Sequence, residues 1–178
     1  MTSEYIGELK KWVAEASRLN GTGESADWAQ AIEIISKSFS VKNHEVAIMG
    51  LTPDERSLRF IVPQTLRAVG QVPLSSTKSL AARTVREKRP DLVNHFTAVP
   101  HASVFEAVPI ADDRRTDAIQ KIMSSPIIQN GKVIGVVQVS RKGSTISEAG
   151  ADFTYPQLRE LKTISDTLAP CVLLHSKD

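Results

Sequence analysis

The chain has 178 residues, of which 41% are hydrophobic and 24% are charged, and its formal net charge is +2. This length suits one domain that buries its own core, and so small a net charge gives no reason to expect a nucleic acid or a membrane surface as a partner. Cys171 is the only cysteine, which excludes an intramolecular disulfide. Because there is no apolar run of the roughly 18 residues that span a bilayer and no signal-peptide pattern, we expect a cytoplasmic protein.

Apolar residues at alternating spacings of three and four predict two amphipathic helices in the first 40 residues. Asn20-Gly21 ends the first helix, because both residues tolerate a left-handed backbone, and Ser25 or Asp27 caps the second. The apolar positions are Tyr5, Leu9, Trp12, Ala16 and Leu19 in the first helix, over about residues 3–20, and Trp28, Ile32, Ile35 and Phe39 in the second.

The hydrophobic period changes to two near Val46, which predicts an antiparallel hairpin of strands at 46–51 and 58–62. A short strand at 71–74, a helix at 75–88 and a short strand at 91–94 follow, with Pro90 ending the helix. Residues 100–115 have no clean period, so we expect a loop there with a short helix at 101–106.

The last third of the chain has the strongest local signals. Asn130-Gly131 predicts a tight turn between strands at 120–128 and 133–141. Thr154 and Gln157 form a capping box for the final helix, and Phe153 and Leu158 sit where a hydrophobic staple forms. Pro170 lies inside this helix and is expected to kink or weaken its last turns.

The stretch from Ser124 to Val139 resembles the penultimate hairpin of GAF domains, and the helix that begins at Phe153-Thr154 resembles their closing helix. The resemblance covers about residues 28–172, and PAS domains, with a similar layout, are the alternative. It implies an α+β fold with an antiparallel sheet of five or six strands. The terminal helices would pack on one face, and a roof segment (residues 75–120) of loop and short helix would cover a ligand pocket on the other.

The resemblance also implies one domain over residues 1–178. Residues 1–40 would form helices for dimerisation, and residues 41–178 would form the sheet, the roof segment and the closing helix. Family members commonly dimerise through their terminal helices, and the apolar stripes of the predicted helices suit such a bundle. We therefore expect a homodimer that acts on a separate signalling protein.

Polar residues within the apolar strands are the main candidates for ligand contacts, because buried polar groups need hydrogen-bond partners. Gln138 and Ser140 share one face by period two, and each could equally bind water near a strand end. The predicted ligand-binding residues are Ser124, Gln138 and Ser140 of the strands, and His95, His101 and Phe105 of the roof segment. The two histidines could instead be partly exposed loop residues.

Other clusters favour structural interpretations. The basic stretch from Lys78 to Arg89 could contact an anion or a nucleotide phosphate, but a solvated helix face is the simpler interpretation. Asp112, Asp113 and Asp117 could serve a metal or an acid–base pair, but two arginines lie between them, and an exposed loop held by ion pairs is the simpler interpretation. No histidine or cysteine set has metal-ligand spacing, so no metal is expected.

Cys171 shares the apolar face of its helix and is interpreted as a small core residue. The GAF-type free methionine sulfoxide reductases need several cysteines, and a single cysteine cannot complete their cycle. No nucleophile has a positioned base, so we predict no catalytic residues and no enzyme activity. The preferred hypothesis is a small-molecule-sensing regulatory domain whose ligand and cofactor are unknown. The alternative is a ligand-free interaction module whose pocket is filled by Phe96, Phe105 and Met123.

Overall fold

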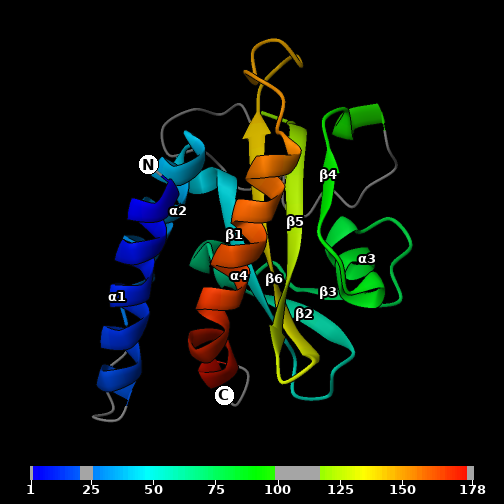
Figure 1. Cartoon of the computed structure of the whole chain (residues 1–178). Coiled ribbons are helices and arrows are strands. Elements are labelled where there is room, and N and C mark those ends of the chain that lie inside the picture. The colour runs from blue at the N-terminus through cyan, green and yellow to red at the C-terminus, as the bar shows by residue number, and fades with distance from the viewer. Residues whose placement is uncertain (1, 21–25, 99–116, 176–178) are drawn as a thin grey trace.

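In the computed structural model, which describes residues 2–20, 26–98 and 117–175, six strands form one antiparallel sheet in the order β3-β2-β1-β6-β5-β4 (Figure 1). The strands are β1 (Val46–Leu51), β2 (Ser57–Val62), β3 (Gln71–Pro73), β4 (Asp91–Val93), β5 (Ile119–Gln129) and β6 (Lys132–Lys142). The helices are α1 (Thr2–Asn20), α2 (Trp28–Phe39), α3 (Leu80–Glu87) and α4 (Tyr155–His175), with short 3-10 turns η1 (Asn43–Glu45), η2 (Gln64–Leu66) and η3 (Phe96–Ala98). The predicted α+β fold is confirmed.

Most of the predicted helix caps and turns have the hydrogen bonds and backbone angles that were expected of them. The Asp27 carboxylate caps α2 by accepting a hydrogen bond from the Ala29 N–H at 2.9 Å. The Thr154 N–H donates to Gln157 Oε1 at 3.0 Å, as in a capping box. Asn130 and Gly131 adopt φ angles of 51° and 78°, which suits a type I′ turn between β5 and β6.

The helix α3 begins five residues later than predicted, at Leu80 instead of residue 75. Ser79 caps it, with its hydroxyl accepting a hydrogen bond from the Ala82 N–H at 3.2 Å. The preceding residues form a turn, because the Arg86 guanidinium donates to the carbonyls of Leu74 and Ser76. These hydrogen bonds hold the residues before Ser79 in the turn, outside α3.

The helix α4 continues past Pro170 to His175, although Pro170 cannot donate to the carbonyl of Asp166. Both residues lie on the exposed side of the helix, where water can replace the missing donor. None of the helices within the described residues has the length and apolar character needed to cross a membrane.

One face of the sheet, the helix face, packs against α2 and α4 (Figure 1). The helix α1 packs mainly on α4 and α2 and forms an outer layer, which refines the prediction that it lies on the sheet. Trp12 and Trp28 join α1 to α2, with ring centroids 5.1 Å apart, and the Trp12 indole N–H donates to the Asp27 carbonyl at 3.1 Å. The apolar stripe of α1 is therefore buried within the chain.

The opposite face, here called the roof face, has its own apolar core around α3. Phe96 is buried there. Met123 is on the helix face, because it pairs with Val139 and both belong to the core beneath α4. The prediction that Met123 fills a cavity under the roof segment is therefore wrong, and Phe105 lies outside the described residues.

Gly135 marks the closest approach between β6 and its neighbours. A Cβ atom at this position would lie 2.3 Å from the Met49 carbonyl oxygen and 3.1 Å from Cγ1 of Val172 in α4. The first distance is shorter than van der Waals contact permits, so any side chain would force the strands or the helix apart.

We expect Gly135→Ala to lower the free energy of unfolding by about 1–3 kcal/mol, because an added methyl group overpacks the core. Urea denaturation followed by circular dichroism measures the change. Gly7→Ala is the matched control, since nothing lies within 4 Å of its added Cβ, and it should stabilise α1 by up to about 1 kcal/mol. Equal stability of the Gly135 variant and the wild type would contradict the packing described.

Candidate functional site

A row of buried polar side chains lies on the roof face of β5 and β6. Antiparallel pairing places Ser124 opposite Gln138 and Ile122 opposite Ser140, so the polar residues share one face. Gln138 is 4% exposed, and Ser124 and Ser140 are fully buried. Gln120 and Thr84 are also buried near this row. The structure thus brings together the three predicted residues of the strands.

Ser124 binds the roof-face helix α3 through a chain of hydrogen bonds. The Gln138 amide nitrogen donates to Ser124 Oγ at 3.2 Å, and Ser124 Oγ lies 2.7 Å from Thr84 Oγ1. The Thr84 hydroxyl donates to the Leu80 carbonyl at 2.8 Å, so Ser124 must donate to Thr84. This bond to Ser124 uses one of the four hydrogen-bonding positions of the Gln138 amide.

Ser140 fixes the start of β1 instead of pointing to open space. Its hydroxyl donates to the Glu45 carbonyl at 3.2 Å. The buried Glu45 carboxylate accepts hydrogen bonds from the backbone N–H groups of Lys42 and Lys142, both at 2.7 Å. Ser124 and Ser140 are thus held by hydrogen bonds within the fold, and the Gln138 amide donates one bond to Ser124 among the described residues.

Of the roof-segment candidates, only His95 lies within the described residues. His95 lies at the surface just before η3, and His101 and Phe105 fall outside the described residues. Thr97 of η3 donates to the Gln120 side chain at 3.3 Å, and Gln120 donates to the Gly143 carbonyl at 2.8 Å. The segment that leads to residues 99–116 is therefore bound to the polar row.

The sequence analysis did not identify Thr84, Glu45 or Gln120 as part of this cluster. Thr84 had a usable signal, because it shares the apolar helical face of Leu80, Ala81 and Val85. Glu45 accepts one hydrogen bond from nearby Lys42 and one from Lys142, and the sequence pattern could not indicate the distant partner. Within residues 2–20, 26–98 and 117–175, no three metal-ligating side chains come together.

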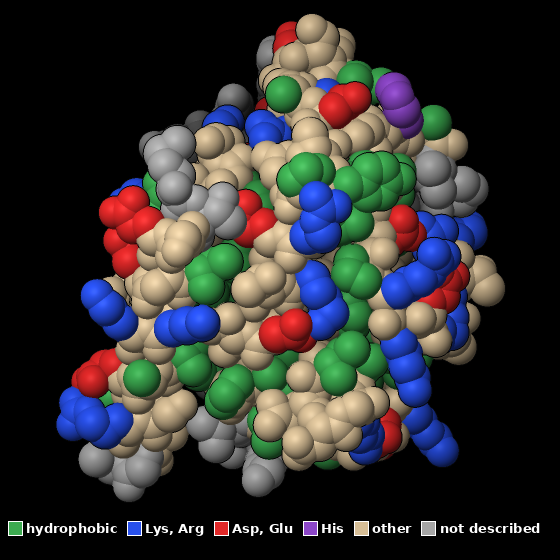
Figure 2. All heavy atoms as spheres, viewed as in Figure 1, with side chains coloured by type: hydrophobic (Ala, Val, Ile, Leu, Met, Phe, Trp, Pro, Cys, Tyr) green, Lys and Arg blue, Asp and Glu red, His purple; other side chains and the backbone are tan. Residues whose placement is uncertain are grey.

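Lys and Arg side chains gather over α3 (Figure 2, right), but several are used by the fold. Arg83 pairs with Asp91 at 2.5 Å, and Arg89 pairs with Glu87 at 2.7 Å. Arg86 holds the turn before α3, as described above. The small cavity at the start of α3, of about 30 Å³, has room for about one water molecule. These contacts favour the structural interpretation of the basic stretch.

A second set of hydrogen bonds joins the end of β4 to the start of α4. The Asn94 side chain donates to the Phe153 carbonyl at 3.0 Å and accepts from the Phe153 N–H at 2.9 Å. The Arg141 guanidinium lies 4.7 Å from the centre of the Phe153 ring and donates to the Phe39 carbonyl at the end of α2. Phe153 therefore joins β4, β6 and α2.

Cys171 is 2% exposed and lies in α4, on the helix side of the sheet. Burial raises the pKa of its thiol to about 11, although a hydrogen bond with Ser17 of α1 opposes the shift. A thiol with such a pKa is almost fully protonated at neutral pH, and the thiolate is the reactive form. Cys171 is thus suited to packing between α1 and α4.

A two-faced antiparallel sheet, with helices on one face and a buried polar row on the other, defines this chain as an α+β domain. A family model for the GAF domain matches residues 28–172, which is more than half of the chain. The chain therefore belongs to the GAF family, whose members are signalling and sensing modules. No curated protein matches it at the sequence level.

Solved structures agree with the family assignment. The GAF domain of an Acinetobacter phosphoenolpyruvate-protein phosphotransferase is similar with a TM-score of 0.69 and 13% identity, over 99% of this chain and 95% of that one. The free methionine-R-sulfoxide reductase from Neisseria meningitidis, solved with its substrate, has a TM-score of 0.65 and 13% identity, over 99% and 90%. At these identities the similarity establishes the fold alone.

We expect Ser124→Ala to lower the free energy of unfolding by about 1–3 kcal/mol, because it leaves Thr84 and Gln138 without their shared partner. The neighbouring Ser125→Ala is the control. Ser125 Oγ is buried on the helix face without a hydrogen-bond partner among the described residues, so its removal should be neutral or stabilising. Urea denaturation of both variants measures the difference. A greater loss in the Ser125 variant would contradict the proposed network.

Proposed function

We propose that this chain is a regulatory GAF module that binds a small molecule on the roof face of its sheet. The observation that carries the proposal is the polar row centred on Gln138, in a face whose remaining side chains form an apolar core. Sites for small molecules combine an apolar lining with a few placed polar groups. An amide that both donates and accepts can bind many polar ligands.

The comparisons support a ligand on this fold without naming one. The structurally similar reductase from Neisseria meningitidis was solved in complex with its substrate, so a GAF-like fold of this size can hold a small molecule. Because identity is 13%, the chemistry of that substrate does not carry over to this chain. The ligand class is therefore left to experiment.

We further propose that the chain is not a thiol-dependent reductase. A cycle of thiol attack and disulfide resolution needs a reactive thiolate and a second thiol. Cys171 is the only cysteine in the sequence, and burial both covers its sulfur and raises the pKa of the thiol. It also lies on the helix side, across the sheet from the polar row. A sensory role fits these properties better.

A thermal-shift screen of nucleotides, haem, amino acids and bilins tests the sensory proposal. A ligand at 100 times its dissociation constant should stabilise the fold by about 2.7 kcal/mol and raise the Tm. Gln138→Leu should remove most of that rise, whereas Gln129→Leu, at the far end of the same strand pair, should retain it. The absence of any stabilising ligand, or equal responses from both variants, would sink the proposal.

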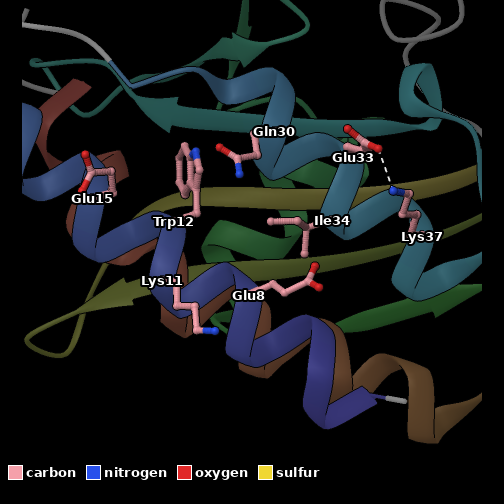
Figure 3. A pocket seen from close by; sticks show the side chains of 8 residues that line it. All are labelled: Glu8, Lys11, Trp12, Glu15, Gln30, Glu33, Ile34 and Lys37. Carbon is pink, nitrogen blue, oxygen red and sulfur yellow. Dashed lines mark hydrogen bonds and ion pairs between the residues drawn. The ribbon is translucent and has the colours of Figure 1, made fainter.

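We also propose that the chain self-associates through the outer faces of α1 and α2. Because the centre of the apolar stripe of α1 is buried within the chain, the proposed contact uses the open groove between these helices, with a volume of about 530 Å³ (Figure 3). Figure 3 shows Trp12 and Gln30 facing each other across it and the ion pair between Glu33 and Lys37 at one end. The remaining lining residues are Glu8, Lys11, Glu15 and Ile34.

Sedimentation velocity tests the dimer with a matched pair of charge reversals on α1. Lys11→Glu should weaken association by at least about threefold, because the groove already has more acidic than basic residues. Lys10→Glu makes the same charge change one residue away, outside the groove, and should have little effect. A wild-type chain that stays monomeric at high concentration would refute the proposal.

A further inference from the structure

A second pocket lies on the helix side of the molecule, at the start of α2, with a volume of about 630 Å³. This Trp28 pocket is formed by the first turns of α2, by η1 and by the end of β2. It is lined by Ala26, Asp27, Trp28, Ala29, Ile32, Asn43, His44, Val62, Pro63 and Gln64. It is open to solvent, and its volume lies in the range of about 300–1,000 Å³ that small-molecule sites occupy.

The lining is divided into an apolar part and a polar part. Trp28 and Ile32 are almost fully buried, while Val62 and Pro63 are half-buried. Polar groups lie around them, chiefly the carboxylate of Asp27. A lining of this kind suits a compact ligand with one polar end.

Asp27 is held rigidly and carries the only formal charge among the described residues that line the pocket. Its carboxylate caps α2 and its carbonyl accepts from Trp12, so both backbone and side chain are fixed. Burial, with Lys142 nearby, lowers the pKa of His44, so the imidazole is neutral at pH 7 and does not repel a cation. The lining of the pocket thus has one formal negative charge, at the residue that precedes Trp28 in the chain.

We propose that the Trp28 pocket binds a small organic cation, an ammonium group attached to a compact apolar body. The ammonium group would pair with the Asp27 carboxylate, and the indole of Trp28 would add to its attraction, because an aromatic ring attracts a cation. The apolar body would cover the half-buried Val62 and Pro63 and exclude water from them. This site is distinct from the roof face, and neither proposal depends on the other.

The two tryptophans of the chain give a direct optical readout. Trp28 lines the pocket, the Trp12 ring contacts the Trp28 ring, and the sequence contains no other tryptophan. Titration with phenylethylammonium, excited at a wavelength that only tryptophan absorbs, should change the fluorescence in a saturable way. 2-Phenylethanol and phenylacetate have the same ring with no charge and with a negative charge. Both should bind at least about threefold more weakly, as an exposed charge pair is worth up to about fivefold.

Two variants assign the response to the pocket. Asp27→Asn keeps a good helix cap but removes the charge, so it should abolish the preference for the ammonium probe. Asp166→Asn, an equal charge change on the exposed side of α4, should preserve that preference. Ala29→Leu places a larger side chain in the pocket and should weaken binding of all three probes, while circular dichroism confirms that α2 still forms.

The outcomes separate this proposal from the roof-face proposal. Saturable, Asp27-dependent binding of the ammonium probe supports the cation site, whether or not a roof-face ligand is found. Equal binding of the three probes, the same response from Asp27→Asn as from the wild type, or no saturable change at all would overturn it. A fluorescence change that Gln138→Leu removes and Ala29→Leu leaves intact would assign the probe to the roof face and would also overturn it.

Discussion

The pairing of β5 with β6 decides which side chains can meet on either face of this molecule. Each strand has eleven residues, and the turn at Asn130-Gly131 sets their register. Because side chains alternate along a strand, a slip by one residue would turn one strand over relative to the other and place Ser124 and Gln138 on opposite faces. The polar row, the helix-side core and the position of α4 all depend on this one register.

Burial of polar groups is the main cost of that arrangement, and the fold offsets it with specific partners. Ser124 and Thr84 satisfy each other, and Glu45 accepts two backbone N–H groups, so these groups lose little on leaving water. Ser125, one residue along β5, faces the apolar helix side without a partner in the described part of the chain. The polarity of the roof face is therefore an organised network, and our proposal places the ligand contact at its member Gln138.

Features that depend on neighbouring residues could be predicted from the sequence. The hairpins, the caps at Asp27 and Thr154, and the alternation that groups Gln138 with Ser140 are of this kind, because each rests on chemistry within a few residues. The face of Met123 could also have been predicted, since it precedes Ser124 and must point the other way. The wrong prediction came from its apolar character alone.

Features that depend on distant residues could not be predicted in this way. Thr84 and Ser124 are 40 residues apart, and Arg86 shortens α3 by binding carbonyls that no local pattern marks. The position of α1 on α2 and α4 depends on Trp12 meeting Trp28. Its apolar stripe predicted burial but could not reveal which surface would cover it. The Trp28 pocket is formed by residues from three separate elements, and for that reason the sequence pattern could not predict it.

The paired hydrogen bonds between Asn94 and Phe153 have a mechanical consequence. They hold an edge strand to Phe153, two residues before the closing helix begins, and Arg141 extends the connection to the end of α2. The strand end cannot move away from the closing helix without breaking both bonds, and a rigid α4 would carry any shift of Phe153 along its whole length. The end of the edge strand β4 is therefore tied through Phe153 and Arg141 to the helices on the other side of the sheet edge.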